Sequence, residues 1–299
     1  KLSPQEKTDL KLNIIGKIPE ILLDNTDRNR TSPFAFTGNK FELRAVGSTA
    51  NCSSPMMVLN TIVADQLVKF HASVQKLVAK DIKKDEAIFQ VLKQYILESK
   101  NIRFEGNGYG DEWVKEAKKR GLSNFLTTPS ALDSVLSKSS RELFERNQIL
   151  SQRELEARYE IDLEGYTKKI QIESRVMGDL AINHIIPTAI AYQNILIENV
   201  SGLKNIFPAS ELESMAGEQI SSVKNISERI QKITSLAEEM RTERKSANLL
   251  LDHKTKADAY CAKVLPFFEK LRREVDKLEL VVSDECWPLP KYRELLFNR

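Results

Sequence analysis

The chain has 299 residues, 41% of them hydrophobic, which is enough for one large globular domain or two ordinary ones. Its 45 lysines and arginines nearly balance 42 acidic residues, and the net charge of +3 argues against nucleic acid or a membrane as the main partner. The three cysteines have no paired spacing, which argues against a disulfide framework or a zinc site.

The first elements predicted are a helix and a hairpin. Apolar residues between Leu10 and Leu22 recur every three or four positions, which indicates a helix that ends before the polar run 24–32. Phenylalanines and aliphatic residues then alternate from Pro33 to Val46 around the turn 37–40, which is typical of a β-hairpin. This is the clearest β region of the sequence.

Several shorter helices follow. Ser53, Ser54 and Pro55 form a helix-start pattern before an amphipathic stretch that reaches Phe70. Further helices are predicted over 85–98 and 111–119, and another begins near Thr128.

The second half predicts long helices. Apolar faces at helical spacing run from Leu155 to Leu180, from Val223 to Met240 and from Val264 to Leu278. A kink is expected at Pro187, and short connections predict an antiparallel bundle, with coiled-coil dimerisation as the alternative. The predicted fold is mainly α, with a domain over 1–150 and a long-helix bundle over 151–299 that ends in a docking tail around Trp287.

The clearest candidate site combines a basic loop with one strand. Arg28 and Arg30 lie on the loop, and strand alternation places Glu42 and Arg44 on one face. In a cleft, the carboxylate could bind a hard divalent cation and the arginine a phosphate or carboxylate. The alternative is an exposed cross-strand charge ladder, which spacing alone does not exclude.

Other patterns carry less chemistry. The glycine-rich stretch 105–110 has no phosphate-loop pattern, and His71, His184 and His253 have no metal-ligand spacing. His184, beside two isoleucines, is expected to be partly buried. A basic cluster at 115–120 could bind nucleotide phosphate, but a solvated helix face is the simpler interpretation.

The candidate loop and strand resemble a known family. The stretch NTDRNRTSPFAFTGNKFELRAVG, residues 25–47, is similar to the NR(S/T) loop and E-x-R strand of glutamine synthetases. Residues 44–67, the motif SRELFERN at 140–147, the long stretch 155–194 and CWPLPKYRELLF at 286–297 resemble the type III branch. The resemblance covers most of the chain and corresponds to the C-terminal part of that family.

The resemblance implies an ATP-dependent ligation of ammonia to L-glutamate through γ-glutamyl phosphate, with Mg²⁺ or Mn²⁺. It assigns Glu42 to a metal ion, Arg44 to the transferring phosphoryl group and Arg30 to substrate carboxylate or phosphate. A further family arginine after the loop is absent, and Arg28 is the possible substitute, as a nucleotide-binding residue. The hairpin would belong to the edge of the catalytic barrel, so the intact protein would be α+β.

The family's β-grasp domain and its other metal ligands have no counterpart here. We therefore expect a chain that is incomplete as a catalyst, from a cytoplasmic homo-oligomer of stacked rings. The alternatives are a non-enzymatic helical scaffold and a regulatory nucleotide-binding module. Whether Glu42 and Arg44 face a concave surface or solvent distinguishes the first alternative from a synthetase.

Overall fold

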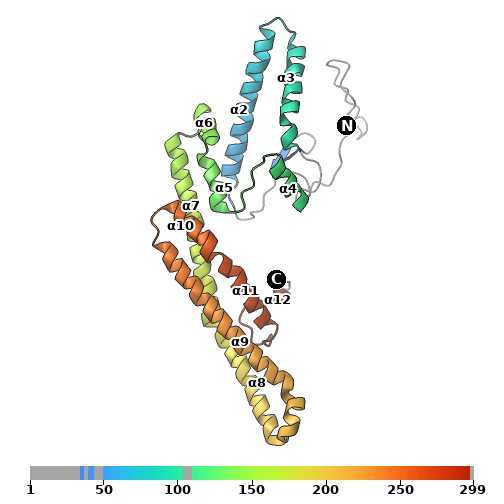
Figure 1. The fold of residues 1–299 in the computed structure, drawn as a ribbon, viewed down its shortest axis with the longest axis vertical. Coiled ribbons are helices and arrows are strands. Elements are labelled where there is room, and N and C mark those ends of the chain that lie inside the picture. The colour runs from blue at the N-terminus through green and yellow to red at the C-terminus, as the bar shows by residue number, and fades with distance from the viewer. Residues whose placement is uncertain (1–33, 37–39, 44–49, 104–109, 297–299) are drawn as a thin grey trace, which may run out of the picture. The chain divides into compact units, whose positions relative to one another are not determined.

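The computed structural model describes residues 34–36, 40–43, 50–103 and 110–296 (Figure 1). These residues form two compact units. The first unit contains the described residues up to Leu126 together with Lys138–Ser151, and the second contains Thr127–Ser137 and the residues from Gln152 onward. The fold is mainly α, as the sequence predicted.

The first unit contains the hairpin and a pair of antiparallel helices. Strand β1 (Phe34–Phe36) pairs antiparallel with β2 (Phe41–Leu43), which forms the predicted hairpin. Helix α2 (Ser53–Val78) packs against α3 (Lys84–Glu98), and the short helices of this unit are η2 (Ser99–Ile102), α4 (Asp111–Lys119) and α6 (Lys138–Arg146). The expected serine cap of α2 is wrong: Asn51 Oδ1 accepts a hydrogen bond from the backbone nitrogen of Ser53 at 2.9 Å instead.

The core of the α2–α3 pair is small. Val74, Ala87 and Val91 are buried, and the rings of Phe70 and Tyr95 meet edge to face at 5.9 Å. Many other apolar side chains on these helices are exposed; they are Met56, Ile62, Val63, Leu67, Val68, Leu92, Ile96 and Leu97. The apolar face predicted for α2 therefore lies largely open among the described residues.

The second unit is built on one continuous helical stretch. Helix α7 (Gln152–Asp179) passes through the π-helical turn η4 (Leu180–Ile185) into α8 (Ile186–Ile206). The predicted kink site, Pro187, stands directly after this turn. Proline has no N–H and its ring crowds the preceding turn, so a local change of hydrogen-bond spacing accommodates it while the helix continues.

Helix α9 (Ala209–Asn248) returns antiparallel beside α7 and α8 after a two-residue connection, as Figure 1 shows. Gln193 of α8 fixes the register, because its side chain donates to Val223 O at 2.8 Å and to Ser227 Oγ at 2.6 Å. The third predicted segment comprises α10 (His253–Ala259), the π-helical turn η5 (Tyr260–Val264) and α11 (Pro266–Glu279). A proline again follows a π-helical turn closely.

These segments share one hydrophobic core. The predicted apolar faces point into it, and its buried members on α9 and α11 include Ile226, Ile233, Ala237, Met240, Leu271 and Leu278. Arg229 of α9 and Glu274 of α11 add an ion pair of 2.9 Å in which both side chains are largely buried. Trp287 of the tail is buried in the same core. The antiparallel bundle was thus predicted correctly.

The remaining elements of this unit are α5 (Thr128–Leu132), η3 (Asp133–Leu136) and the C-terminal α12 (Tyr292–Leu296). Thr127 caps α5 by accepting a hydrogen bond from Ser130 N. Asp133 joins this corner to the bundle, because it accepts from Tyr159 Oη at 2.7 Å and pairs with Lys254 Nζ at 3.1 Å. Burial, with the bond to Asp133, raises the pKa of Tyr159 to about 12.

One described helical stretch, Gln152–Ile206, is long and apolar enough to cross a membrane by length and composition alone. The near-neutral net charge had argued against a membrane as the main partner. Core helices of soluble proteins satisfy the same criterion, and this stretch packs along α9. The observation is therefore weak evidence for a membrane span.

Replacement of a buried isoleucine on α9 tests the bundle core. Ile226 is fully buried, so Ile226→Ala should lower the free energy of unfolding by about 2–5 kcal/mol through lost burial and a residual cavity. Ile220, on the same helix, is 45% exposed, and Ile220→Ala should cost less than about 1 kcal/mol. Urea unfolding followed by circular dichroism measures both, and equal losses would contradict the assigned core face.

Candidate functional site

The described residue of the predicted site is Glu42, in the middle of β2. In the hairpin register Glu42 lies opposite Ala35, and its side chain is half-buried. Its Oε1 lies 3.4 Å from Lys40 Nζ. Lys40 thus supplies a positive charge beside this carboxylate, and a carboxylate is the type of oxygen ligand that a hard divalent cation prefers.

The three predicted site arginines, Arg28, Arg30 and Arg44, lie outside the described residues. Their proximity to Glu42 therefore stays a prediction. Within the described part of the chain, no group of three histidine, cysteine or acidic side chains could hold a metal ion. A complete ligand set around Glu42 would thus need carboxylates or histidines from beyond these residues.

The histidines and cysteines form no candidate metal site among the described residues. His71, His184 and His253 stand on separate elements, and His184 is exposed, so the expected partial burial of His184 was wrong. The reason is its position in the π-helical turn, where Ala181 and Ile185 take the buried positions. Cys52, Cys261 and Cys286 are free thiols.

The basic cluster on α4 is partly engaged in the fold. Arg120 donates to Glu116 Oε1 at 2.8 Å and to Arg103 O at 2.8 Å, and its guanidinium lies 5.5 Å from the Trp113 ring centroid. These contacts hold the end of α4 against the segment that precedes it. They favour a structural role for Arg120 over nucleotide binding.

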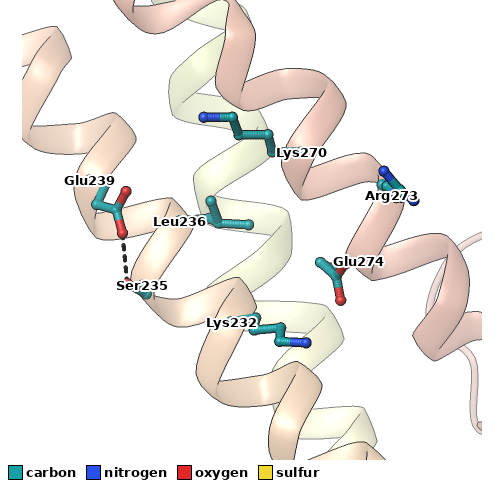
Figure 2. A pocket seen from close by; sticks show the side chains of 7 residues that line it. All are labelled: Lys232, Ser235, Leu236, Glu239, Lys270, Arg273 and Glu274. Carbon is teal, nitrogen blue, oxygen red and sulfur yellow. Dashed lines mark hydrogen bonds between the residues drawn. The ribbon is translucent and has the colours of Figure 1, made fainter.

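A shallow groove lies between α9 and α11 and encloses about 420 Å³. Figure 2 shows its lining, which consists of Lys232, Ser235, Leu236, Glu239, Lys270, Arg273 and Glu274. Ser235 Oγ donates to Glu239 at 2.7 Å, so part of the polar lining is satisfied internally. Burial opposes ionisation of Glu274, but the bond from Lys277 and the charge of Arg229 outweigh it and lower its pKa.

This groove mixes both signs of charge, and its lining residues contain no cluster of metal ligands. Its hydroxyl–carboxylate pair, Ser235 with Glu239, joins neighbouring turns on an exposed face of α9. Leu236 is the apolar residue of the lining. A surface of this kind is more typical of the seam between two packed amphipathic helices than of a catalytic site.

A charged network that the sequence did not reveal ties α2 to α6. Asp65 is buried and accepts from Arg146 Nε at 2.8 Å and Nη2 at 3.0 Å, a bidentate pair. Asn147 Nδ2 donates to the same carboxylate at 3.1 Å, and Lys69 Nζ lies 2.7 Å away. The bond from Arg146, followed by that from Lys69, holds the pKa of Asp65 well below its usual range despite burial.

Arg146 and Asn147 end the motif SRELFERN, which had been noted only for its resemblance. Its adjacent arginine and asparagine could have suggested a carboxylate partner, but nothing local identifies Asp65, which lies 81 residues before Arg146. The network orients α6 against the helix that follows the hairpin. The network therefore positions α6, and each of its four side chains is engaged in it, so it offers no reactive group.

Comparison with known proteins gives the family. Residues 87–204 match the model of the glutamine synthetase C-terminal domain. Over all 299 residues the chain is 52% identical to a glutamine synthetase of Bacteroides fragilis, of which it covers 41%. It is 35% identical over 294 residues, 97% of this chain, to the Type-3 glutamine synthetase of Dictyostelium discoideum, of which it covers 39%. A glutamine synthetase of Butyrivibrio fibrisolvens is 33% identical over 92% of the chain, which covers 38% of that relative.

The fold and these matches define a mainly helical chain that contains a glutamine synthetase C-terminal domain. The chain belongs to the glutamine synthetase family, and the predicted resemblance to the C-terminal part of the type III branch is confirmed. It spans about two fifths of the length of these relatives.

The Asp65 network gives a test of how α6 is held. Asp65→Asn removes a buried charge that accepts from Arg146, the last residue of α6, and from Asn147 directly after it. We expect a loss of about 1–3 kcal/mol in unfolding free energy at pH 7. Because the folded pKa is lowered, this stabilisation is complete above the usual carboxyl pKa of about 4 and declines as the pH falls below it. The variant should therefore lose less stability than the parent between pH 5 and pH 3, by about the same order.

Urea unfolding at these pH values measures both effects. Lys69→Gln is the matched control, because Lys69 is largely exposed and its pairing with Asp65 should contribute only about 0–1 kcal/mol. An Asp65→Asn protein as stable as the parent at pH 7 would show that the network does not hold α6.

Proposed function

We propose that this chain forms the C-terminal part of a glutamine synthetase subunit, which ligates ammonia to L-glutamate with ATP through γ-glutamyl phosphate. The observation that carries the proposal is the 52% identity along the whole chain to a glutamine synthetase of which it covers 41%. The name of that relative states the product, and so high an identity over the whole of this chain supports a shared role for the aligned part.

Within this proposal the hairpin supplies one edge of the catalytic site. Glu42 would ligate Mg²⁺ or Mn²⁺, a role for which a half-buried carboxylate on a strand is suited. Arg44 would hold the transferring phosphoryl group, Arg30 would contact substrate carboxylate or phosphate, and Arg28 would supplement nucleotide binding. The metal, when bound, would supply charge neutralisation at the transferring phosphoryl group.

The described residues support incompleteness in two ways. Glu42 lacks companion metal ligands among them, and α2 and α3 expose a row of large apolar side chains beside a small core. A face of this kind is typical of a surface that another part of a protein covers. We propose that the remaining part of the subunit covers α2 and supplies the missing ligands.

The same proposal includes assembly into a cytoplasmic homo-oligomer of stacked rings. It also includes a domain boundary at residue 150, between the portion of the catalytic domain and the long-helix bundle. In this proposal the long-helix unit takes no part in the reaction. No role in catalysis is assigned to it, because none of the predicted site residues falls within it.

Formation of γ-glutamyl hydroxamate tests the assignment. The 299-residue chain alone should be inactive. A chimera that joins its N-terminus to the part of the Bacteroides fragilis relative outside the alignment should form the hydroxamate in the presence of ATP and Mg²⁺ or Mn²⁺. Activity in neither protein would reject the synthetase proposal, and activity of the chain alone would reject its incompleteness.

Glu42→Ala in the active chimera tests the metal role. Loss of a carboxylate that ligates the metal directly should lower turnover at least about a hundredfold and raise the metal concentration needed for half-maximal activity. Glu86→Ala, which removes an exposed carboxylate from α3, should change turnover less than about twofold and serves as the control. Parental turnover and metal dependence in Glu42→Ala would reject the ligand assignment.

A further inference from the structure

Two arginines face each other across α7 and α9. Gln171 Nε2 of α7 donates to Asn248 Oδ1 of α9 at 2.9 Å. Farther along the pair, a Cβ built on Gly178 would lie 3.7 Å from Met240 Cε. Arg175 follows Gln171 by one helical turn and Arg244 precedes Asn248 by one turn, so the antiparallel register places the two arginines at the same level.

Neither guanidinium has a counter-charge. Among the described residues, no carboxylate lies within ion-pair distance of Arg175 or Arg244, and no hydrogen bond from either side chain is formed. Asp179, one turn after Arg175 on α7, accepts from Asn183, and Glu238 of α9 is held by Arg241.

The electrostatics of this region agree with the register. Burial lowers the pKa of Arg244, and the positive charge of Arg175 lowers it further. Since two like charges at close range destabilise each other, the folded chain holds this pair at a cost that a bound anion would relieve.

A buried tyrosine lies near the pair. Tyr260 is fully buried at the start of the π-helical turn η5, and its hydroxyl donates to Asn248 Oδ1 at 2.7 Å. Burial raises the pKa of Tyr260, while the charges of Arg244 and Arg175 act in the opposite direction, so all three groups lie in one neighbourhood. Helices α7 and α9 and the turn η5 thus fix the backbone that carries both guanidiniums, which limits the ordering cost of binding.

We propose that Arg175 and Arg244 form a binding site for a phosphate group, separate from the catalytic edge at Glu42. Each guanidinium offers a planar pair of donors, and a phosphate dianion provides two charges and enough oxygens to accept from both. A carboxylate carries one charge and two oxygens, which a single guanidinium already satisfies. Phosphate is therefore the better match for two opposed arginines.

Binding of inorganic phosphate to the 299-residue chain tests the site. Isothermal titration, with NaCl keeping the ionic strength constant, should give saturable binding at about one site per chain. Arg175→Gln and Arg244→Gln should each weaken that binding at least about tenfold, as expected for loss of charge-assisted hydrogen bonds. Arg241→Gln is the matched control, because Arg241 lies one turn away on α9 and is paired with Glu238, and it should change binding less than about twofold.

Thermal unfolding without phosphate separates this role from a structural one. Removing one of two repelling charges should leave the unfolding temperature of Arg175→Gln and Arg244→Gln unchanged or raised, whereas a structural role predicts a decrease. Phosphate should then raise the unfolding temperature of the parent more than that of either variant.

Competing anions identify the ligand class. Sulfate, which has the same shape, should compete with phosphate, and acetate or L-glutamate at equal ionic strength should not. Equal binding by the parent and both variants would overturn the site. Acetate binding as tight as phosphate binding would overturn the phosphate assignment and indicate a carboxylate ligand.

Discussion

The second unit depends on burial of a single face of α9. Helix α9 has forty residues, and local propensity alone would not keep them helical, because most helical stability in proteins comes from packing of an apolar face. Ile226, Ile233 and Met240 are almost fully buried on that face. Each contributes about 1.5–3 kcal/mol by leaving water, and together they hold α7, α8 and α11 around one axis.

The two π-helical turns show how this packing tolerates proline. Both Pro187 and Pro266 follow such a turn closely, and the backbone nitrogen of Leu265 bonds to Tyr260 O at 2.9 Å, five residues back. The widened turn accommodates the missing donor and lets the apolar face continue. It also places Tyr260 in the core, where its hydroxyl meets Asn248 and, beyond it, Gln171. Tyr260, Asn248 and Gln171 satisfy one another there, whereas Arg175 and Arg244, one turn farther along the two helices, form no hydrogen bond or ion pair within the described part of the chain.

The first unit, in contrast to the second, has little buried apolar core. Its core is small and its main helix exposes apolar residues. The one carboxylate that is buried among its described residues, Asp65, is held by Arg146, Lys69 and Asn147. A network of this kind specifies how α6 lies on α2 without adding a reactive group. The unit is therefore more consistent with part of a larger catalytic domain than with an independent catalyst, which agrees with the two fifths of its relatives that the chain covers.

Hydrophobic periodicity alone determined the helix faces, from Leu155 on α7 to Leu278 on α11, because a 3.6-residue repeat directly reports which side is buried. Sequence also located the hairpin through strand alternation around a glycine turn. The family motifs suggested roles for Glu42 and the three site arginines, and all of these roles stay predictions. Only tertiary structure decided that Asp65 meets Arg146 and that Arg175 stands opposite Arg244. Those two pairings depend on the register between helices that are far apart in the chain. A local sequence pattern determines which face of a helix is buried, but it does not determine which residue of another helix packs against that face.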